Sequence, residues 1–233
     1  MTQLFLCGGA EGKIKDLDEL FVSTFKGNSN RMLYLPIAHP EISINGVKYT
    51  HKALFGWAKK YFSNYNIKNI DMWTDLSNKD YEDVKKYGAI YIGGGNTFDL
   101  LSEFRKSGFD QLLERYINNE GVVYGSSAGA IILGKNIGTA KFGEDPDTNR
   151  IQLKDLSGLN KAKGYAICCH YTKIEDEKIA QYVRENDFAV ITLPSETGLH
   201  ISNLGMKIIG SSAAYLFKDS KKIKLEVGKL LRQ

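Results

Sequence analysis

Apolar and polar positions alternate in blocks along the first 133 residues of the chain. The segment 15–27, KDLDELFVSTFKG, places apolar residues three or four apart, and this spacing predicts an amphipathic helix after the apolar run QLFLCGG. Three further pairs of an apolar run and a helical segment follow: RMLYLPIA before YTHKALFGWAKKYFSNY, IKNIDMW before NKDYEDVKKY, and GAIYIGGG before NTFDLLSEFRKSG. Such alternation predicts a parallel sheet with helices on both faces.

The pattern changes after Leu133. The short apolar segments YAICCHY, DFAVITL, GLHIS, KIIG and AAYLF are separated by few helical residues, and only 174–186, IEDEKIAQYVREN, has a helical pattern. We therefore expect an α/β fold with a doubly wound, mainly parallel sheet in the first half and extra antiparallel strands in the C-terminal half. A chain of 233 residues with 42% hydrophobic content fits one domain, taken as 1–233.

Charge and cysteine content narrow the partners. The net charge of +4 is small and the lysines are spread out, so we expect no nucleic-acid partner. No apolar run approaches the ~18 residues of a membrane span, and the opening MTQLFLCGG lacks the basic lead of a signal peptide. The three cysteines, Cys7, Cys168 and Cys169, lie in apolar segments without zinc-site spacing. These features predict a cytoplasmic protein with no membrane partner, metal or cofactor.

Two strand-to-helix turns are candidates for a site, because doubly wound sheets bind ligands beyond the carboxyl ends of their strands. The first has three consecutive glycines at 93–95, followed by Asn96 and Thr97 as candidate helix caps. Phosphate binding is the alternative role of such glycines, but neither GxGxxG nor GxxxxGK[ST] is present. The second, GSSAG at 125–129, satisfies G-x-S-x-G, a pattern that directs the middle serine, Ser127, into the crevice and Ser126 elsewhere.

Ser127 is therefore a candidate nucleophile, although small residues at such a turn also serve packing or capping. Backbone N–H groups of Gly94 or Gly95 and of Ala128 are placed to converge on one oxygen atom as an oxyanion hole. Oxygen nucleophiles of this kind need a base to take the hydroxyl proton.

Four histidines are available as that base. His170 closes the apolar run YAICCHY, where a strand end would bring it to the edge of the crevice, and it is the best candidate. The alternative for this position is a buried structural histidine. His39 is predicted in a loop, His51 on a helix and His200 inside a strand.

The motifs GAIYIGGGNTFDLL, YGSSAGAIILG, HYT and ITLPSETG resemble those of peptidase family S51, which contains aspartyl dipeptidase (peptidase E) and cyanophycinase. The resemblance spans roughly residues 1 to 218. It implies a fold similar to class I glutamine amidotransferases, with serine in place of the nucleophilic cysteine. It also implies hydrolysis of a peptide or β-linked isopeptide bond of a small, dipeptide-like substrate through an acyl-enzyme. In this chain Ser127 matches the nucleophile, His170 the base, and Gly94, Gly95 and Ala128 the oxyanion-hole region.

The third member of the triad has two assignments in such enzymes. One is an aspartate shortly after the nucleophile's helix, which falls in KFGEDPDT at Glu144, Asp145 or Asp147. The other is a glutamate after the next strand, here Glu196 of LPSETG. We favour Glu196, with Asp145 as the alternative, because the apolar strand before it supplies the rigid element that an orienting carboxylate needs.

Substrate contacts are expected from Asn96, Thr97 and Lys173. In aspartyl dipeptidase an arginine soon after the histidine reads the substrate's aspartate, but the corresponding stretch here, TKIEDEKIA, holds only Lys173 and Lys178 as cations. Lysine does not replace the guanidinium fork. Aspartyl specificity is thus in doubt.

Two other functions stay open at this stage. One is an amidohydrolase or glutaminase on the same fold, which the serine at position 127 disfavours. The other is a non-catalytic protein that binds a small amino-acid-like ligand. For either, as for the peptidase, the expected partner is a small molecule, and a homodimer is kept open.

Overall fold

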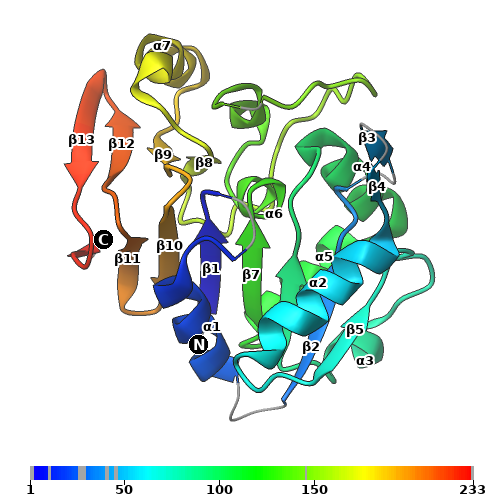
Figure 1. Ribbon diagram of the computed structural model, residues 1–233. Helices are drawn as coiled ribbons and strands as arrows, with labels where there is room; N and C mark the ends of the chain where they lie inside the picture. Colours follow the sequence, from blue (N-terminus) through cyan, green and yellow to red (C-terminus); the bar gives the residue numbers. More distant parts are fainter. Residues whose placement is uncertain are drawn as a thin grey trace.

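The computed structural model describes residues 3–9, 12–25, 30–39, 42–44, 47–144 and 146–231, with the backbone alone for 42–44 and 47–49. Its largest element is an eight-stranded sheet in the order β14-β11-β10-β1-β7-β6-β2-β5 (Figure 1). The strands are β1 (Gln3–Cys7), β2 (Arg31–Leu35), β5 (Asn69–Met72), β6 (Ala89–Ile92), β7 (Val122–Ser126), β10 (Thr197–Ser202), β11 (Gly205–Gly210) and β14 (Leu230–Leu231).

Strand β1 divides this sheet into two parts. It pairs parallel with β7, and the strands from β7 to β5 are all parallel. On its other side it pairs antiparallel with β10, and β11 and β14 continue that pattern. The expected combination of a mainly parallel sheet and extra C-terminal antiparallel strands is confirmed.

A smaller sheet of four strands in the order β13-β12-β9-β8 completes the second half. Here β8 (Ala166–Cys168) and β9 (Val190–Thr192) run parallel, while β12 (Ala214–Lys218) and β13 (Lys221–Leu225) are antiparallel additions. Strands β3 (Ile42–Ile44) and β4 (Val47–Tyr49) form a separate hairpin that the sequence pattern did not predict.

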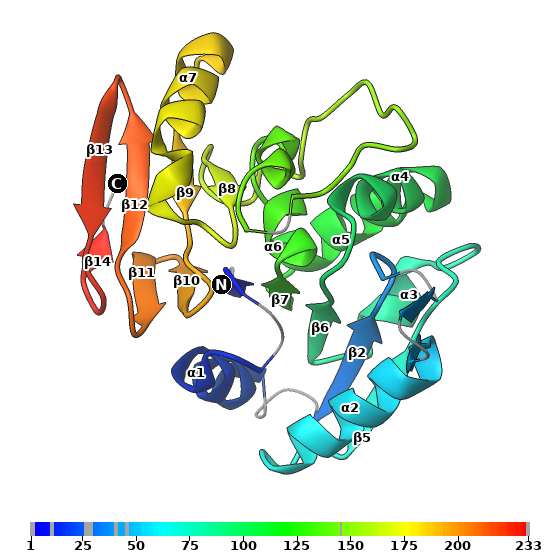
Figure 2. The ribbon, with the colours of Figure 1, turned by 45° about the horizontal axis from the view of Figure 1, so that its top comes forward.

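Helices cover both faces of the large sheet, as expected from the alternating pattern (Figure 2). On one face lie α1 (Lys15–Phe25) and α2 (His51–Ser63), and on the other α4 (Thr97–Ser107), α5 (Phe109–Asn118) and α6 (Ala128–Ile132). Helix α7 (Asp176–Asn186) packs on the small sheet. The predicted helix at 78–87 is wrong in length, because only α3 (Tyr81–Val84) forms there.

A row of aromatic rings crosses the sheet face that packs on α1 and α2. The strand registers place its members side by side: Tyr34, Tyr91, Tyr124, Phe5 and His200. The rings of Tyr91 and Tyr124 stack with centroids 4.6 Å apart. Such pairs add to the free energy gained by burying the rings.

One carboxyl group is buried against this row. Asp18 of α1 is 1% exposed, and the hydroxyl of Tyr61 donates to its Oδ2 at 2.5 Å. Burial raises the pKa of Asp18 to about 6, and the hydrogen bond from Tyr61 opposes that rise.

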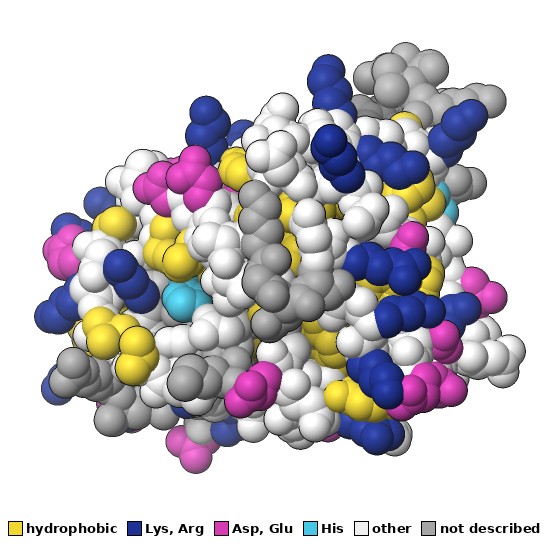
Figure 3. All heavy atoms as spheres, turned by 90° about the horizontal axis from the view of Figure 1, so that it is seen from below, with side chains coloured by type: hydrophobic (Ala, Val, Ile, Leu, Met, Phe, Trp, Pro, Cys, Tyr) yellow, Lys and Arg dark blue, Asp and Glu magenta, His cyan; other side chains and the backbone are white. Residues whose placement is uncertain are grey.

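The face that is seen from below carries charges of both signs. Figure 3 shows lysine and arginine side chains interspersed with carboxylates rather than gathered into one patch. The absence of a nucleic-acid partner stays a prediction.

Candidate active site

Ser127 stands at a sharp turn between β7 and α6. Its backbone has φ 49° and ψ −109°, a region that non-glycine residues rarely adopt. The flanking glycines make the turn possible, since a Cβ on Gly125 would collide with the carbonyl of Gly129, and a Cβ on Gly129 with the carbonyl of Ile92. The sequence pattern G-x-S-x-G is thus explained by backbone contacts on both sides of the serine.

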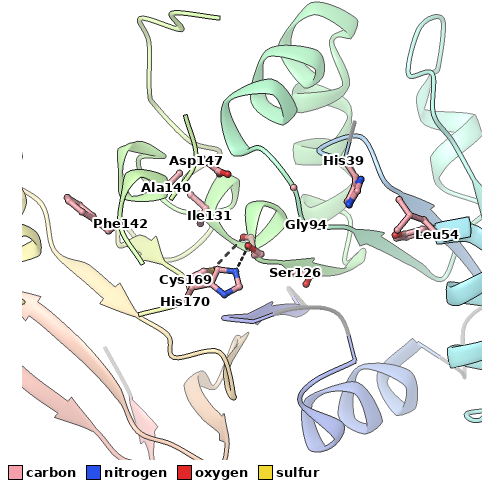
Figure 4. Close-up of a pocket in the computed structure, with 13 residues that line it drawn as sticks. His39, Leu54, Gly94, Ser126, Ile131, Ala140, Phe142, Asp147, Cys169 and His170 are labelled. Atoms are coloured by element: carbon pink, nitrogen blue, oxygen red, sulfur yellow. Dashed lines mark hydrogen bonds between the residues drawn. The ribbon is translucent and has the colours of Figure 1, made fainter. Parts of the chain in front are cut away.

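The two serines of the motif point in different directions. Ser126 is fully buried, and its hydroxyl donates to the carbonyl of Gly9 at 3.2 Å. Oγ of Ser127 instead lies 2.8 Å from Nε2 of His170 at the floor of a cavity (Figure 4). This is the distance at which a histidine can accept a hydroxyl proton.

The backbone of His170, like that of Ser127, adopts an unusual conformation and is fixed by contacts with neighbouring segments. It follows β8 with φ 52°, another conformation that costs free energy for a non-glycine residue. The N–H of Glu144 donates to its carbonyl at 3.3 Å. Gly143, with φ 97°, lets that loop approach, because a Cβ there would lie 3.1 Å from the same carbonyl.

The end of β1 lies between the nucleophile and the base. The N–H of Ser127 donates to the carbonyl of Cys7 at 3.0 Å, and the N–H of His170 donates to the carbonyl of Gly8 at 2.8 Å. Adjacent carbonyls of one strand end therefore fix the backbones of both residues.

The other ring nitrogen of His170 does not face the expected residue. Nδ1 lies 3.2 Å from Oγ of Ser195. Glu196, favoured from the sequence for this place, is exposed, and its Oε1 accepts from the hydroxyl of Ser212 at 2.6 Å. The chain turns here, with the N–H of Thr197 donating to the carbonyl of Pro194 at 2.9 Å, so that side chains 195 and 196 diverge.

The acidic loop was the second source of a third triad member. Asp145 lies outside the described residues, and Glu144 is exposed. Asp147 does reach the cavity wall, where its Oδ2 accepts from the N–H and the hydroxyl of Thr97, at 2.9 and 2.6 Å.

Of the predicted oxyanion-hole residues, Gly94 and Gly95 line the same cavity as Ser127, and Ala128 follows Ser127 in the chain. A Cβ on Gly94 would lie 3.4 Å from that of Ser127, and Gly95 adopts φ 131° as the turn passes against Ala38. Within the described part of the chain, the N–H groups of Gly94, Gly95 and Ala128 have no hydrogen-bond acceptor. Unpaired donors beside a serine hydroxyl are suited to binding an oxyanion.

The three expected substrate contacts lie elsewhere. The Asn96 side chain caps α4 by accepting from Phe98 and Asp99, and its amide donates to the carbonyl of Thr148 at 3.0 Å. Thr97 is fully buried, with its hydroxyl on Asp147. Lys173 is exposed and lines a second depression rather than the cavity above Ser127. Asn96 and Thr97 are therefore structural residues of a helix terminus.

The cavity encloses about 410 Å³, within the usual range of small-ligand sites. Its lining residues are Tyr34, His39, Leu54, Gly94, Gly95, Ser126, Ser127, Ile131, Ala140, Phe142, Asp147, Cys169 and His170. Asp147 is the one acidic member of this wall, and the wall described here has no lysine or arginine. His39, which the sequence placed only in a loop, enters the wall because β2 ends at the same sheet edge as β7 (Figure 4).

All three cysteines are buried, and none forms a disulfide. Burial raises the pKa of Cys168 to about 12 and that of Cys169 well above its usual value. Neither is a thiolate nucleophile at neutral pH, which weighs against glutaminase-type chemistry.

The described residues contain no group of three histidine, cysteine or carboxylate side chains arranged to hold a metal ion. Among them, no helix has the length and apolar character needed to cross a membrane.

Residues 4–209 match the sequence model of peptidase family S51. The chain belongs to this family. One curated relative, an uncharacterized peptidase of Pasteurella multocida, is 32% identical over 117 residues, which cover 50% of this chain and 56% of the relative. A peptidase E of Shewanella denitrificans is 21% identical over 201 residues, 84% of this chain and 82% of that protein. The chain spans a little over half the length of the first of these.

Solved structures of peptidases share the fold. A putative peptidase E of Listeria monocytogenes EGD-e superposes with a TM-score of 0.68 at 21% identity, covering 91% of this chain and all of the other. A peptidase of an acI-B1 actinobacterium gives 0.74 at 16% identity, covering 99% and 96%. This S51 chain therefore shares the mixed α/β fold of these solved structures.

Proposed function

We propose that this S51 chain is a serine-type peptidase that cleaves a peptide or isopeptide bond of a small, dipeptide-like substrate through an acyl-enzyme. The observation that carries the proposal is the 2.8 Å contact between Oγ of Ser127 and Nε2 of His170 at the floor of the cavity. The strained turn at Ser127 supports it, since such strain persists where the surrounding structure holds a reactive group in place. The fold family in which we place this chemistry is that of the class I glutamine amidotransferases, with serine replacing cysteine.

Acylation begins with neutral His170. Its Nε2 accepts the proton of Ser127 as Oγ attacks the carbonyl carbon, and the carbonyl π electrons move to oxygen. The N–H groups of Gly94, Gly95 and Ala128 stabilise the resulting oxyanion. When the oxyanion collapses, the C–N bond breaks and the leaving nitrogen takes the proton from Nε2.

Deacylation repeats these steps with water. His170 takes a proton from the water molecule, whose oxygen attacks the acyl carbon. Collapse of the second intermediate breaks the bond to Oγ, and Ser127 regains its proton from Nε2. No atom or charge is left over, so the cycle needs only substrate and water.

The cavity wall indicates which substrates fit. Its one carboxylate among the described lining residues is Asp147, and Lys173, which we expected from the sequence to contact substrate, lines another depression. The described wall has no lysine or arginine, so it offers no guanidinium or ammonium partner to a negatively charged substrate side chain. We therefore infer a preference for neutral or cationic residues over aspartate on the acyl side.

A dipeptide library tests the proposal. We expect the wild type to release free amino acids from a subset of neutral dipeptides and Ser127→Ala to release none, while calorimetry shows that the variant still binds the same dipeptides. Binding without turnover in the wild type would favour the non-catalytic ligand-binding alternative. Equal turnover in wild type and Ser127→Ala would refute the serine mechanism.

A further inference from the structure

The hydroxyl of Ser195 lies beside the one nitrogen of His170 that the acyl-transfer steps leave unused. Nδ1 and Oγ are 3.2 Å apart. We propose that Ser195 is the positioning residue of this site, holding the imidazole of His170 in the orientation and tautomer that acyl transfer requires. The inference rests on the proposed function and assigns a neutral hydroxyl to a position where a carboxylate is usual.

Ser195 can hold the ring because its own backbone is fixed. The carbonyl of Leu193 accepts from the N–H of Tyr171, next to the histidine. On the other side Gly9 presses against Ser195, and any Cβ at position 9 would overlap the Ser195 carbonyl. The turn closed by Pro194 and Thr197 completes the support. A side chain supported in this way loses little further entropy when it makes a hydrogen bond.

The position of the proton on the imidazole decides whether His170 or Ser195 donates the hydrogen bond. Nε2 must be unprotonated to accept the proton of Ser127, so the neutral ring carries its proton on Nδ1. Nδ1–H then donates to Oγ of Ser195. After Ser127 is deprotonated the ring is an imidazolium, Nδ1–H still donates to Ser195, and no proton moves to the Ser195 hydroxyl.

A hydroxyl performs this task less selectively than a carboxylate. It can also donate, so Ser195 tolerates the other tautomer, in which Nδ1 accepts and Nε2–H points at Ser127. That tautomer cannot act as base. A carboxylate only accepts when ionised, and its charge also stabilises the imidazolium. An aspartate at position 195 should therefore favour the productive tautomer.

The two substitutions at this position are expected to act in opposite directions. Ser195→Ala removes the acceptor and should lower kcat about tenfold with little change in KM, the loss expected for one hydrogen bond. In this variant the acid limb of the pH profile of kcat/KM should move to lower pH, because the imidazolium of His170 loses its hydrogen-bond acceptor. Ser195→Asp should move the same limb to higher pH and restore or exceed wild-type kcat.

Ser212→Ala is the matched control, since it removes a hydroxyl from the same region that contacts Glu196 rather than the histidine. It should leave kcat and the pH profile unchanged. Circular dichroism and thermal melting show whether each variant folds. Wild-type kcat together with an unmoved acid limb in Ser195→Ala would overturn the inference.

A measurement independent of turnover separates this inference from the proposed function. Nitrogen-15 shifts of the His170 ring report its tautomer, and Ser195→Ala should lower the fraction protonated at Nδ1 while Ser195→Asp raises it. An unchanged fraction in both variants contradicts the positioning role even if Ser127 is catalytic. If the wild type hydrolyses no peptide but the tautomer shifts as expected, the proposed function fails and the role of Ser195 in holding the ring stands.

Discussion

The backbone N–H and the hydroxyl of Thr97 both donate to Oδ2 of Asp147, at 2.9 and 2.6 Å. This pair fastens the loop after residue 141 to the first turn of α4, directly beyond the glycines at 93–95. Asp147 is thereby held in the wall of the cavity that also contains Ser127 and His170.

We expect the Asp147 carboxylate to lower kcat/KM for acidic substrates. Asp147→Asn should narrow the ratio of kcat/KM between alanyl and aspartyl dipeptides by about tenfold, the effect of ~1.4 kcal/mol of repulsion at a partly exposed site. Asparagine can still accept from Thr97, so the loop stays in place. Asp99→Asn is the control, because that carboxylate pairs with Arg150 outside the cavity wall. An unaltered ratio in Asp147→Asn would mean that another group sets specificity.

Ser127 and Ser126 provide a matched test of the nucleophile. A fluorophosphonate should label Ser127 of the wild type, and peptide mapping by mass spectrometry locates the adduct. Ser127→Ala should lose labelling and about 10⁴-fold or more in kcat, keeping only the rate due to binding and the oxyanion hole. Ser126→Ala should retain labelling. It should lose some stability, because the buried hydroxyl of Ser126 donates to the carbonyl of Gly9. An adduct on Ser126 would contradict the assignment.

The glycines of the turn allow a test of packing. Gly129→Ala places a Cβ against the carbonyl of Ile92 and should lower the free energy of unfolding by about 1–3 kcal/mol. It should also lower kcat, because the end of β6 leads into Gly94. Gly56→Ala is the counterpart on α2, where nothing lies within 4 Å of the added carbon. It should raise the free energy of unfolding by about 0.5–1 kcal/mol. Urea unfolding of both variants, with equal m-values, checks the pair.

Asp18 makes stability depend on pH. Its pKa of about 6 in the folded state exceeds the usual value of 3.8, so the folded carboxyl holds a proton that the unfolded one has lost in the window between them. The free energy of unfolding should fall as pH rises from 4 to 6. Above pH 6 it should stay about 3 kcal/mol below its value at low pH. Asp18→Asn should remove this fall and be more stable than the wild type at pH 7.5.

Chemical unfolding at pH 4.5 and 7.5 measures that difference. Asp16→Asn serves as control, because Asp16 is exposed on the same helix. If Asp18→Asn and Asp16→Asn change stability equally at both pH values, the buried carboxyl of Asp18 is not the source.

Features fixed by local patterns were predictable from the sequence. The alternation of apolar runs and helices sets the sheet, and G-x-S-x-G identifies the turn at Ser127 because both depend on neighbouring residues. The length of α3 was not predictable in this way. Its capping box at Asp80 and Asp83 starts a helix, but the chain turns into β6 after only a few residues.

Features that depend on distant segments were missed. Whether residue 195 or 196 faces His170 is set by a turn packed against Gly9, which lies far away in the sequence. His39 reaches the cavity wall from a loop outside any recognisable motif, and Asp147, which the sequence indicated only as a candidate triad member, reaches it from another loop. Spacing along the sequence does not show that two such loops line one cavity, because the direction of a side chain in a loop depends on tertiary packing.

The position of β1 has a consequence for the order in which the protein is made. Strand β1 is synthesised before its partners β7 and β10, which follow more than 100 and 190 residues later. The carbonyls of Cys7 and Gly8 cannot receive the N–H groups of Ser127 and His170 until the segment up to His170 has been synthesised. The nascent chain therefore carries an unpaired, apolar β1 until β7 and β10 have been made, and Ser127 and His170 come together only after His170 has been added.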